Sequence, residues 1–386
     1  MSWLCWGCVL MAACAVNSHS NESPSAPQAA DADSTASSML PEAPAAAGTG
    51  VEPAQAGAGG ESGASEPPAS TTANAGAAGE ASGVSVPPMA AAAGSGGAEP
   101  PLVAAPEGCA PPPEGASVEE INALNTVNTL RAAAGAPCLT LDLNIGKAAK
   151  AHCAYYALNI ESAPECVISP HYEVVGCAGY TGSTPSERMR AAGFASGGGG
   201  GEVMAFLDNP ARAVQTWVDS VWHRIPILDT ATTVMGYGSA EGCDTIDFGP
   251  NRRREALSLV AYPYAGQIGV TTAFDGRNEG PMPPAPTTGW PSANPISLYG
   301  QQLLITEHQL FVDGDDTPLE HTWLDPTSPI LPADQQSLLR NVVFMYANQP
   351  YLPNTTYRVK IVGTYAGGDL LREWTFTTGA PRRMRP

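Results

Sequence analysis

The sequence predicts an α+β protein, in which a domain of helices and strands precedes a smaller all-β sandwich and follows a long disordered segment. Residues 117–120, Ser-Val-Glu-Glu, form a helix capping box, and apolar residues follow at helical spacing as far as Gly135. Beyond about residue 295, short apolar runs bounded by turn residues are typical of a sandwich. Residues 15–115 are mostly Ala, Gly, Pro, Ser, Thr and Glu. They offer too little apolar surface to offset the entropy lost on ordering.

These changes in composition divide the chain into segments. A length of 386 residues is sufficient for two domains with separate cores. In chain order we expect an export signal, a disordered linker, the α+β domain, a short Pro- and Gly-rich linker and the β-sandwich. Their respective ranges are 1–14, 15–115, 116–275, 276–290 and 291–380.

Local signals place further elements in the first domain. A helix is expected after residues 141–143, with His152 on its packed side, where a core or hydrogen-bonded histidine is more usual than a ligand. A second capping box predicts a helix from Thr184 to Phe194, and a proline start predicts one from Pro210 to Arg224. Strands are expected at residues 234–239 and 257–262, and a solvated turn at residues 251–254.

The charge balance excludes two classes of partner. Asp and Glu number 37 against 18 Lys and Arg, which gives a net charge of -19. Such an acidic protein is not expected to bind nucleic acid or an anionic membrane surface through its folded part.

Cysteine usage predicts disulfide bonds. Six cysteines lie in or just before the first domain: Cys109, Cys138, Cys153, Cys166, Cys177 and Cys243. They lack the paired spacing of a zinc ribbon, so disulfides in an oxidising compartment are expected. Six cysteines allow fifteen pairings. We favour Cys166 with Cys177, because that bond would fasten the loop that carries His171, and leave the other pairings open.

The first 14 residues have the character of an export signal. The run that ends at Cys14 resembles a bacterial lipoprotein signal, in which the cysteine is lipidated after cleavage. Lipidation would confine membrane contact to an N-terminal anchor, with the linker as a tether. A plain secretory signal is the alternative. Either way we expect an extracytoplasmic protein, bound to the bacterial outer envelope or secreted.

Two histidines and a glutamate are the candidate site. His171, Glu202 and His223 are carried by the segment between residues 171 and 224. Two neutral imidazoles and a carboxylate that converge can hold Zn²⁺ or another divalent cation, or transfer protons near neutral pH. Alternatively, the histidines only hydrogen-bond Glu202 and order the site.

Motifs in order along residues 118–265 resemble the CAP superfamily (cysteine-rich secretory proteins, antigen 5 and pathogenesis-related class 1 proteins), especially its bacterial SCP-like members. The matching residues are Asn128, Arg131, Gly135, Pro137-Cys138-Leu139, His152, His171, Gly182, Pro185, Arg188, Ala192-Gly193-Phe194, Gly201-Glu202, Trp217, Ser220, His223-Arg224 and Val234-Met235-Gly236-Tyr237-Gly238. Residues 352–357 and 374–379 similarly resemble bacterial Ig-like modules of the cell envelope.

The CAP resemblance implies a three-layer α-β-α sandwich with a cleft, where two His and two Glu can hold a divalent metal. Carried over, the histidines are His171 and His223, and one glutamate is Glu202. Ser220 stands where the second glutamate is expected, with Asp219 beside it on the helix face of His223. Arg188 is also expected at the cleft.

Three functions are compatible with these features. The first is a secreted or envelope-anchored protein that binds a small apolar or lipid-like ligand, or an envelope or extracellular protein partner, in the CAP cleft. The second is a metal-assisted hydrolase that acts on peptide or envelope polymer through His171, Glu202 and His223. The third is a structural surface or adhesion protein. Because the second glutamate is absent, we rank the hydrolase below the binding protein and assign no catalytic residue beyond these candidates.

Overall fold

The computed structural model describes residues 102–195, 201–207, 209–250, 258–328 and 336–380. The expected export signal with Cys14, nearly all of the first linker and the turn at residues 251–254 lie outside these ranges. No helix of the described residues is both long and apolar enough to cross a membrane.

The first domain is built on a four-stranded sheet. Its strands are β1 (Thr140–Leu141), β2 (Gly201–Ala205), β3 (Val234–Ala240) and β4 (Cys243–Phe248), in the order β1-β3-β4-β2. The β1 and β3 strands run parallel, and the other pairs are antiparallel. Side chains alternate between the two faces along each strand. In β2 this alternation places Glu202 and Val203 on opposite faces of the sheet.

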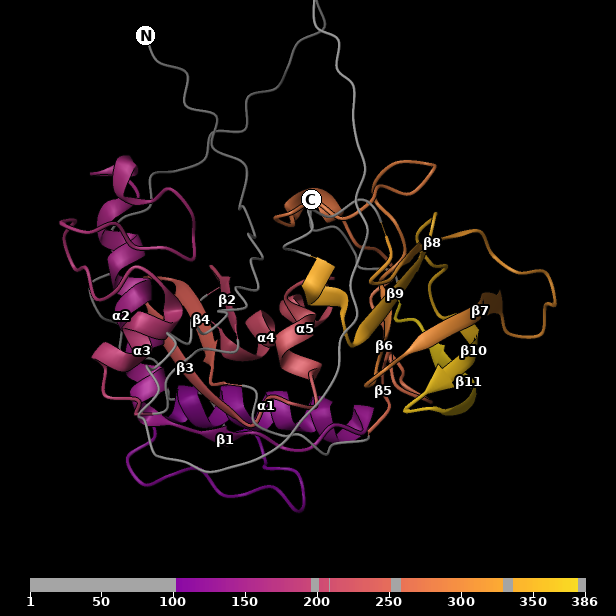
Figure 1. Cartoon of the computed structure of the whole chain (residues 1–386), viewed down its shortest axis with the longest axis horizontal. Coiled ribbons are helices and arrows are strands. Elements are labelled where there is room, and N and C mark those ends of the chain that lie inside the picture. Colours follow the sequence, from indigo (N-terminus) through magenta and orange to yellow (C-terminus); the bar gives the residue numbers. More distant parts are fainter. Residues whose placement is uncertain (1–101, 196–200, 208, 251–257, 329–335, 381–386) are drawn as a thin grey trace, which may run out of the picture. The chain divides into compact units, whose positions relative to one another are not determined.

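Helices cover both faces of this sheet (Figure 1). One layer contains α1 (Val118–Ala134), α4 (Pro210–Val218) and α5 (Arg224–Leu228), which pack with Val203 in the main core. The other contains α2 (Leu143–Asn159) and α3 (Pro185–Ala191), whose side chains pack in smaller clusters. The expected three-layer α-β-α sandwich is therefore confirmed, and Glu202 faces the α2–α3 layer.

Two glycines let α2 lie directly on β3. A Cβ atom at Gly236 would be 2.1 Å from the backbone nitrogen of Gly146, and one at Gly238 would be 2.1 Å from that of Lys150. The obstructing atoms belong to the helix backbone. They therefore cannot move aside by a change of side-chain rotamer. The Val-x-Gly-x-Gly pattern thus fixes the spacing of sheet and helix.

We expect Gly238→Ala to lower the free energy of unfolding by about 1–3 kcal/mol, the usual cost of overpacking a core. Chemical denaturation of both proteins would measure the difference. Gly368→Ala is the matched control, since its added Cβ would meet only ordinary contact, with the Tyr365 carbonyl oxygen 3.8 Å away. Equal losses in the two variants would contradict the packing explanation.

The capping boxes form as expected. Ser117 accepts a hydrogen bond from the backbone of Glu120, whose side chain accepts one from the backbone of Ser117, and Gly135 ends α1 in the left-handed region. Thr184 and Glu187 form the same reciprocal pair at α3. That helix ends at Ala191, three residues before the predicted Phe194.

The prediction of one continuous helix from Pro210 to Arg224 is wrong. The α4 helix ends at Val218, and α5 begins only at Arg224. Between them, the backbone N–H groups of Val221 and Trp222 donate to the Glu279 carboxylate at 3.1 and 3.2 Å, in place of helical carbonyls. The inference that Asp219 and His223 share a helix face, four residues apart, is therefore also wrong.

The C-terminal part is all-β, in two antiparallel sheets. The first has the order β5-β6-β9-β8 and the second β11-β10-β7. Their bounds are β5 (Val260–Tyr262), β6 (Ile296–Tyr299), β7 (Leu304–Val312), β8 (His321–Leu324), β9 (Val342–Ala347), β10 (Thr356–Tyr365) and β11 (Gly368–Thr377). Short 3₁₀ turns occupy Pro164–Cys166, Gly276–Asn278 and Ser337–Leu339. An all-β C-terminal part is thus confirmed, while its Ig-like identity stays a prediction.

The two folded parts share packing. The predicted strand at residues 257–262 is present as β5, but it pairs with β6 of the C-terminal sheet. The main core joins Trp222 of the first domain to Tyr299 and Phe344 of this sheet. The fully buried Arg224 donates across the junction to the carbonyl oxygen of Pro295 at 2.6 Å.

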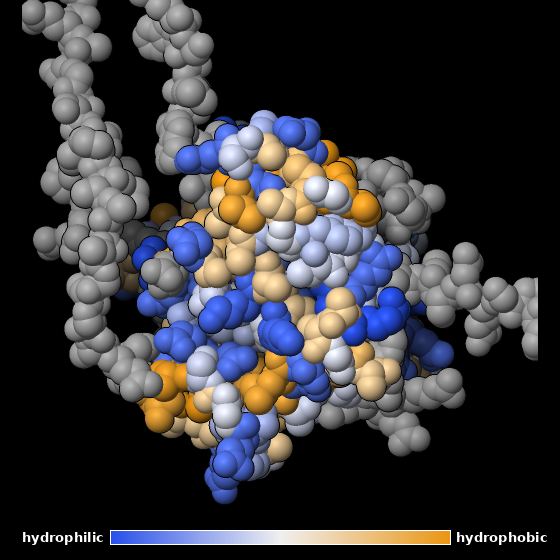
Figure 2. All heavy atoms as spheres, turned by 90° about the vertical axis from the view of Figure 1, so that its left-hand side faces the viewer, coloured by the Kyte–Doolittle hydropathy of each residue, from blue (hydrophilic) through white to orange (hydrophobic). Residues whose placement is uncertain are grey.

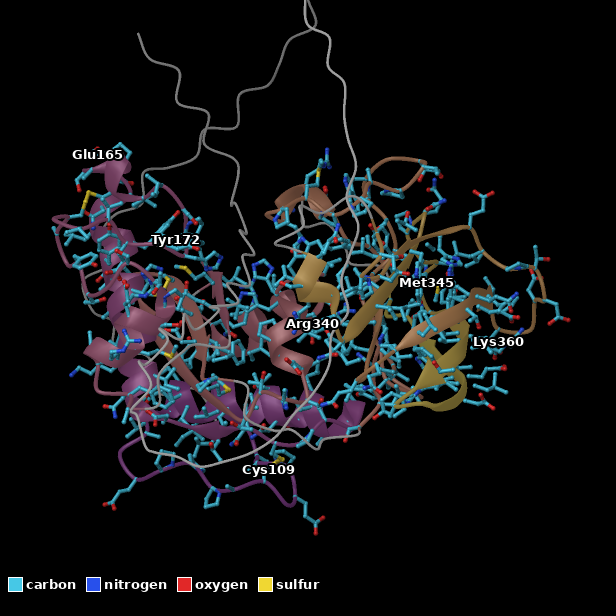
Figure 3. The ribbon with its side chains drawn as sticks, in the orientation of Figure 1. Cys109, Glu165, Tyr172, Arg340, Met345 and Lys360 are labelled. Carbon is cyan, nitrogen blue, oxygen red and sulfur yellow. A yellow bond between two sulfur atoms is a disulfide. The ribbon has the colours of Figure 1, made fainter. Side chains whose placement is uncertain are left out.

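Within the described residues, three disulfides join Cys109 to Cys138, Cys153 to Cys243, and Cys166 to Cys177. The Cys109 bond lies near α1 in Figure 3, which also places Glu165 at the outer end of the loop after α2. The predicted Cys166–Cys177 pair is confirmed. Such bonds form and persist in oxidising compartments, which places the folded part outside the cytoplasm.

Candidate functional site

His171, Glu202 and Arg188 meet in a buried cluster between β2 and α3. His171 Nδ1 lies 2.8 Å from Glu202 Oε1, and the Arg188 guanidinium forms an ion pair with Glu202 Oε2. A second nitrogen of Arg188 donates to the His171 carbonyl oxygen at 3.1 Å. All three side chains are at most 2% exposed. Both oxygens of Glu202 therefore already have partners.

A second buried carboxylate completes this cluster. His152 Nδ1 lies 3.0 Å from Glu173 Oε1, and its Nε2 lies 2.7 Å from the Pro170 carbonyl oxygen and 3.7 Å from Glu202. Glu173 also accepts from the backbone of Thr181 at 2.6 Å. His152 is thus hydrogen-bonded as expected. Sequence reasoning missed Glu173, although its position two residues after His171 was a usable signal.

The charges of this cluster stabilise one another. Burial by itself would raise the pKa of Glu202, but the Arg188 guanidinium, followed by His152 and His171, holds that pKa well below its usual range. Burial would likewise lower the pKa of Arg188, yet Glu202 and the other nearby carboxylates raise it. Glu202 and Arg188 are therefore an ionised, mutually neutralising pair.

Asp247 is a further buried carboxyl that sequence reasoning missed. It lies on β4 directly opposite Glu202, on the same face of the sheet, and is fully buried. Among the described residues its oxygens have no partner other than the neighbouring Glu202 carboxylate, to which Asp247 can donate only when it is protonated. Burial and then the Glu202 charge raise the pKa of Asp247 well above its usual value. A lone aspartate inside a strand gives no sequence signal for this pairing.

We expect Asp247→Asn to raise the melting temperature at pH 8. Because the folded-state pKa of Asp247 lies above its unfolded value, its ionisation progressively destabilises the fold as pH rises past the unfolded value near 4. The amide cannot ionise, so the gain should vanish toward pH 3. Thermal melts across this range would test it, with the exposed Asp369→Asn as control. A gain that does not depend on pH would contradict the explanation.

His223 does not join the His171–Glu202 pair, since no hydrogen bond or ion pair links it to either residue. Its Nδ1 lies 3.1 Å from Ser220 Oγ and 3.6 Å from Glu279 Oε1. Ser220 donates its own hydrogen to the Trp217 carbonyl oxygen at 2.9 Å, so it accepts from His223 Nδ1. The other ring nitrogen, Nε2, is buried without a hydrogen-bond partner among the described residues.

Glu279 places a carboxylate beside His223 from a distant part of the chain. Its backbone lies just after a 3₁₀ turn in the segment assigned to the second linker, and its side chain is 2% exposed. The surrounding Pro- and Gly-rich sequence gave no sign of a buried carboxylate. The proximity of Glu279 to His223 depends entirely on how the C-terminal segment packs.

The predicted Asp219 is directed toward the C-terminal part. It accepts hydrogen bonds from Thr271 at 2.7 Å and from Asn294 at 2.9 Å. Asp219, Ser220 and Glu279 line one cavity of about 400 Å³ between α4 and residues 271–279. The cavity is further lined by Arg212, Gln215, Thr216, Thr271, Ala273, Phe274, Asp275 and Asn278.

The described residues do not fit the metal that the CAP resemblance implies. Among them, no three His, Cys, Asp or Glu side chains are grouped as a metal site requires. The oxygens of Glu202 are engaged by His171 and Arg188, and His223 lies in a separate group. A serine–histidine–acid relay does not fit either, because Ser220 and Glu279 both approach the same ring nitrogen of His223.

Comparison with known proteins agrees with the fold of the first domain. Residues 124–249 match the family described as CAP: Cysteine-rich secretory protein family. None of the curated proteins compared with the chain matches it. One similar solved structure is an extracellular protein containing a SCP domain from Bacillus anthracis str. Ames, at 20% identity and a TM-score of 0.29. That match covers 35% of this chain and 40% of the other, so the chain spans less than half of that protein. Residues 124–249 thus form a CAP domain of the cysteine-rich secretory protein family.

Proposed function

We propose that the chain is an extracytoplasmic binding protein whose CAP domain recognises a protein partner at the cavity lined by Ser220 and Glu279. The proposal rests on Glu202, because both of its carboxylate oxygens already have partners in the structure. A carboxylate that already accepts from His171 and Arg188 is poorly suited to act as a base or a metal ligand. It is well suited to hold β2, α3 and the loop of His171 together.

The lining of the cavity favours a polar occupant. Of its side chains, only Ala273 and Phe274 are apolar, and Asp219, Asp275 and Glu279 outnumber the single cation Arg212. An acyl chain would remove water from these charged side chains without offering them a polar partner, at a cost in free energy. A protein surface that offers N–H donors or a cationic side chain satisfies them. This ranks the protein partner above the apolar ligand.

To test the proposal, a photo-crosslinking amino acid replaces Thr216, which lines the cavity. The protein is displayed on the cells that naturally produce it. We expect a crosslinked protein adduct at Thr216 and none at Thr306, an exposed threonine of β7. Equal adducts at both positions would indicate a general adhesive surface instead. Co-purified lipid in native mass spectrometry, with no adduct at Thr216, would favour the apolar ligand.

The hydrolase remains a second candidate because of buried groups without partners. His223 Nε2 and Arg188 Nε are both buried without a hydrogen-bond partner in the part of the chain that the structure describes. Buried polar atoms are usually satisfied, so unpaired ones are candidates for contact with a ligand or water. Hydrolysis of peptide or envelope polymer that is lost in Glu202→Gln would favour this function over partner binding.

A further inference from the structure

A second groove lies at the far end of α2, away from the cavity at Ser220. It has a volume of about 680 Å³ and is formed by the last turns of α2, the end of β2 and the β3–β4 hairpin. Its lining residues are Ala154, Tyr156, Ala157, Leu158, Ile160, Glu161, Phe206, Ala240, Glu241 and Cys243. Apart from the two glutamates, this lining is apolar or aromatic.

Large apolar side chains remain open to solvent here. Leu158 is 54% exposed and Ile160 is 40% exposed. Figure 2 faces the side of the molecule that carries α2 and shows hydrophobic residues at both its upper and its lower end. An exposed apolar surface bordered by charged side chains is typical of an interaction site.

Every source of charge at the groove is negative. Glu161 and Glu241 border it, both are exposed, and neither has an ion pair with a described residue. No Lys, Arg or His lines it. The α2 helix also ends here without a basic residue in its last turn, so its carbonyl end adds negative potential. The groove therefore complements a positive charge carried next to an apolar group.

The groove walls are fixed to each other. The Cys153–Cys243 disulfide joins α2 to β4. The rings of Tyr156 and Phe206, 4.9 Å apart, join α2 to the residue after β2. A binding surface held in this way loses little conformational entropy when a partner docks.

We propose that this groove docks a segment of a protein partner in which apolar side chains alternate with Lys or Arg. The apolar side chains would cover Leu158, Ile160 and the Tyr156–Phe206 pair, and the basic groups would face Glu161 and Glu241. The groove shares no lining residue with the cavity at Ser220, so this proposal does not depend on the function proposed above.

The test uses the full chain and fluorescent peptide probes. The probe Leu-Lys-Phe-Arg-Leu-Lys is compared by fluorescence anisotropy with Ser-Lys-Ser-Arg-Ser-Lys and with Leu-Glu-Phe-Glu-Leu-Glu. We expect only the first to bind, and more weakly at high salt. The double variant Glu161→Lys, Glu241→Lys should weaken binding about tenfold or more, because like charges then face each other. Leu158→Glu should weaken it similarly.

Leu371→Glu is the matched control, because Leu371 is an even more exposed leucine (70%, against 54% for Leu158) but lies on β11. Thermal melts establish that each variant is folded, which is expected since the changed side chains are exposed. Unchanged affinity in the Glu161/Glu241 variant, or equal binding of the Ser-Lys probe, would overturn the proposal. Binding of phosphatidylcholine vesicles that is lost in the same variants would also overturn it, in favour of a lipid headgroup.

Discussion

Replacing Arg188 by Met is expected to lower the free energy of unfolding by about 3–5 kcal/mol, the usual cost of removing one partner of a buried ion pair. The change leaves the Glu202 carboxylate charged and buried beside His171 and His152, without its guanidinium partner. Chemical denaturation at pH 7 would measure the loss. Arg190→Met is the matched control, since Arg190 lies on the same helix but is exposed.

The effect of Arg188→Met should depend on pH with a definite sign. Arg188 depresses the folded-state pKa of Glu202, so the stability that this pair contributes is present above the unfolded pKa, near 4, and is lost at lower pH. The difference between the wild type and Arg188→Met should therefore narrow as pH falls below about 4. A loss that is constant with pH would indicate that Arg188 contributes packing rather than charge.

Removing residues 276–380 is expected to prevent the CAP domain from folding to a soluble state. The truncation uncovers Trp222 and removes the acceptors that Asn294, Pro295 and Ser297 offer to the fully buried Arg224. It also leaves the backbone N–H groups of Val221 and Trp222 without Glu279. An uncompensated buried charge and an exposed core together exceed the net stability of a typical domain.

Soluble yield and calorimetry would test this prediction. The full chain should give a single cooperative transition for residues 102–380, while the truncated chain should aggregate. Arg224→Met is an intermediate case that removes the charge but keeps the core covered. A truncated protein that is soluble and melts at the temperature of the full chain would contradict the shared core.

Local interactions account for what the sequence predicted correctly. The helices at Ser117 and Thr184 are set by capping residues three positions apart, and the Cys166–Cys177 bond closes a short loop. The convergence of His171 and Glu202 was expected because the CAP resemblance places both at one cleft. Each of these inferences needed only neighbouring residues or a recognisable motif.

Long-range contacts account for what the sequence did not reveal. The break between α4 and α5 depends on Glu279, which lies about 60 residues beyond α4 and draws the N–H groups of Val221 and Trp222 out of the helical pattern. The pairing of Asp247 with Glu202 depends on strand register. Propensity and spacing cannot encode such contacts, because they exist only after the sheet and the C-terminal segment are packed.

We infer that Glu202 and the histidines brace a binding site instead of holding a catalytic metal. Metal content of the purified protein, measured beside the His171→Ala, His223→Ala double variant after equilibration with zinc, tests it most directly. We expect far less than one zinc per chain, and the same amount in both proteins. One zinc per wild-type chain that is lost in the double variant would contradict the claim.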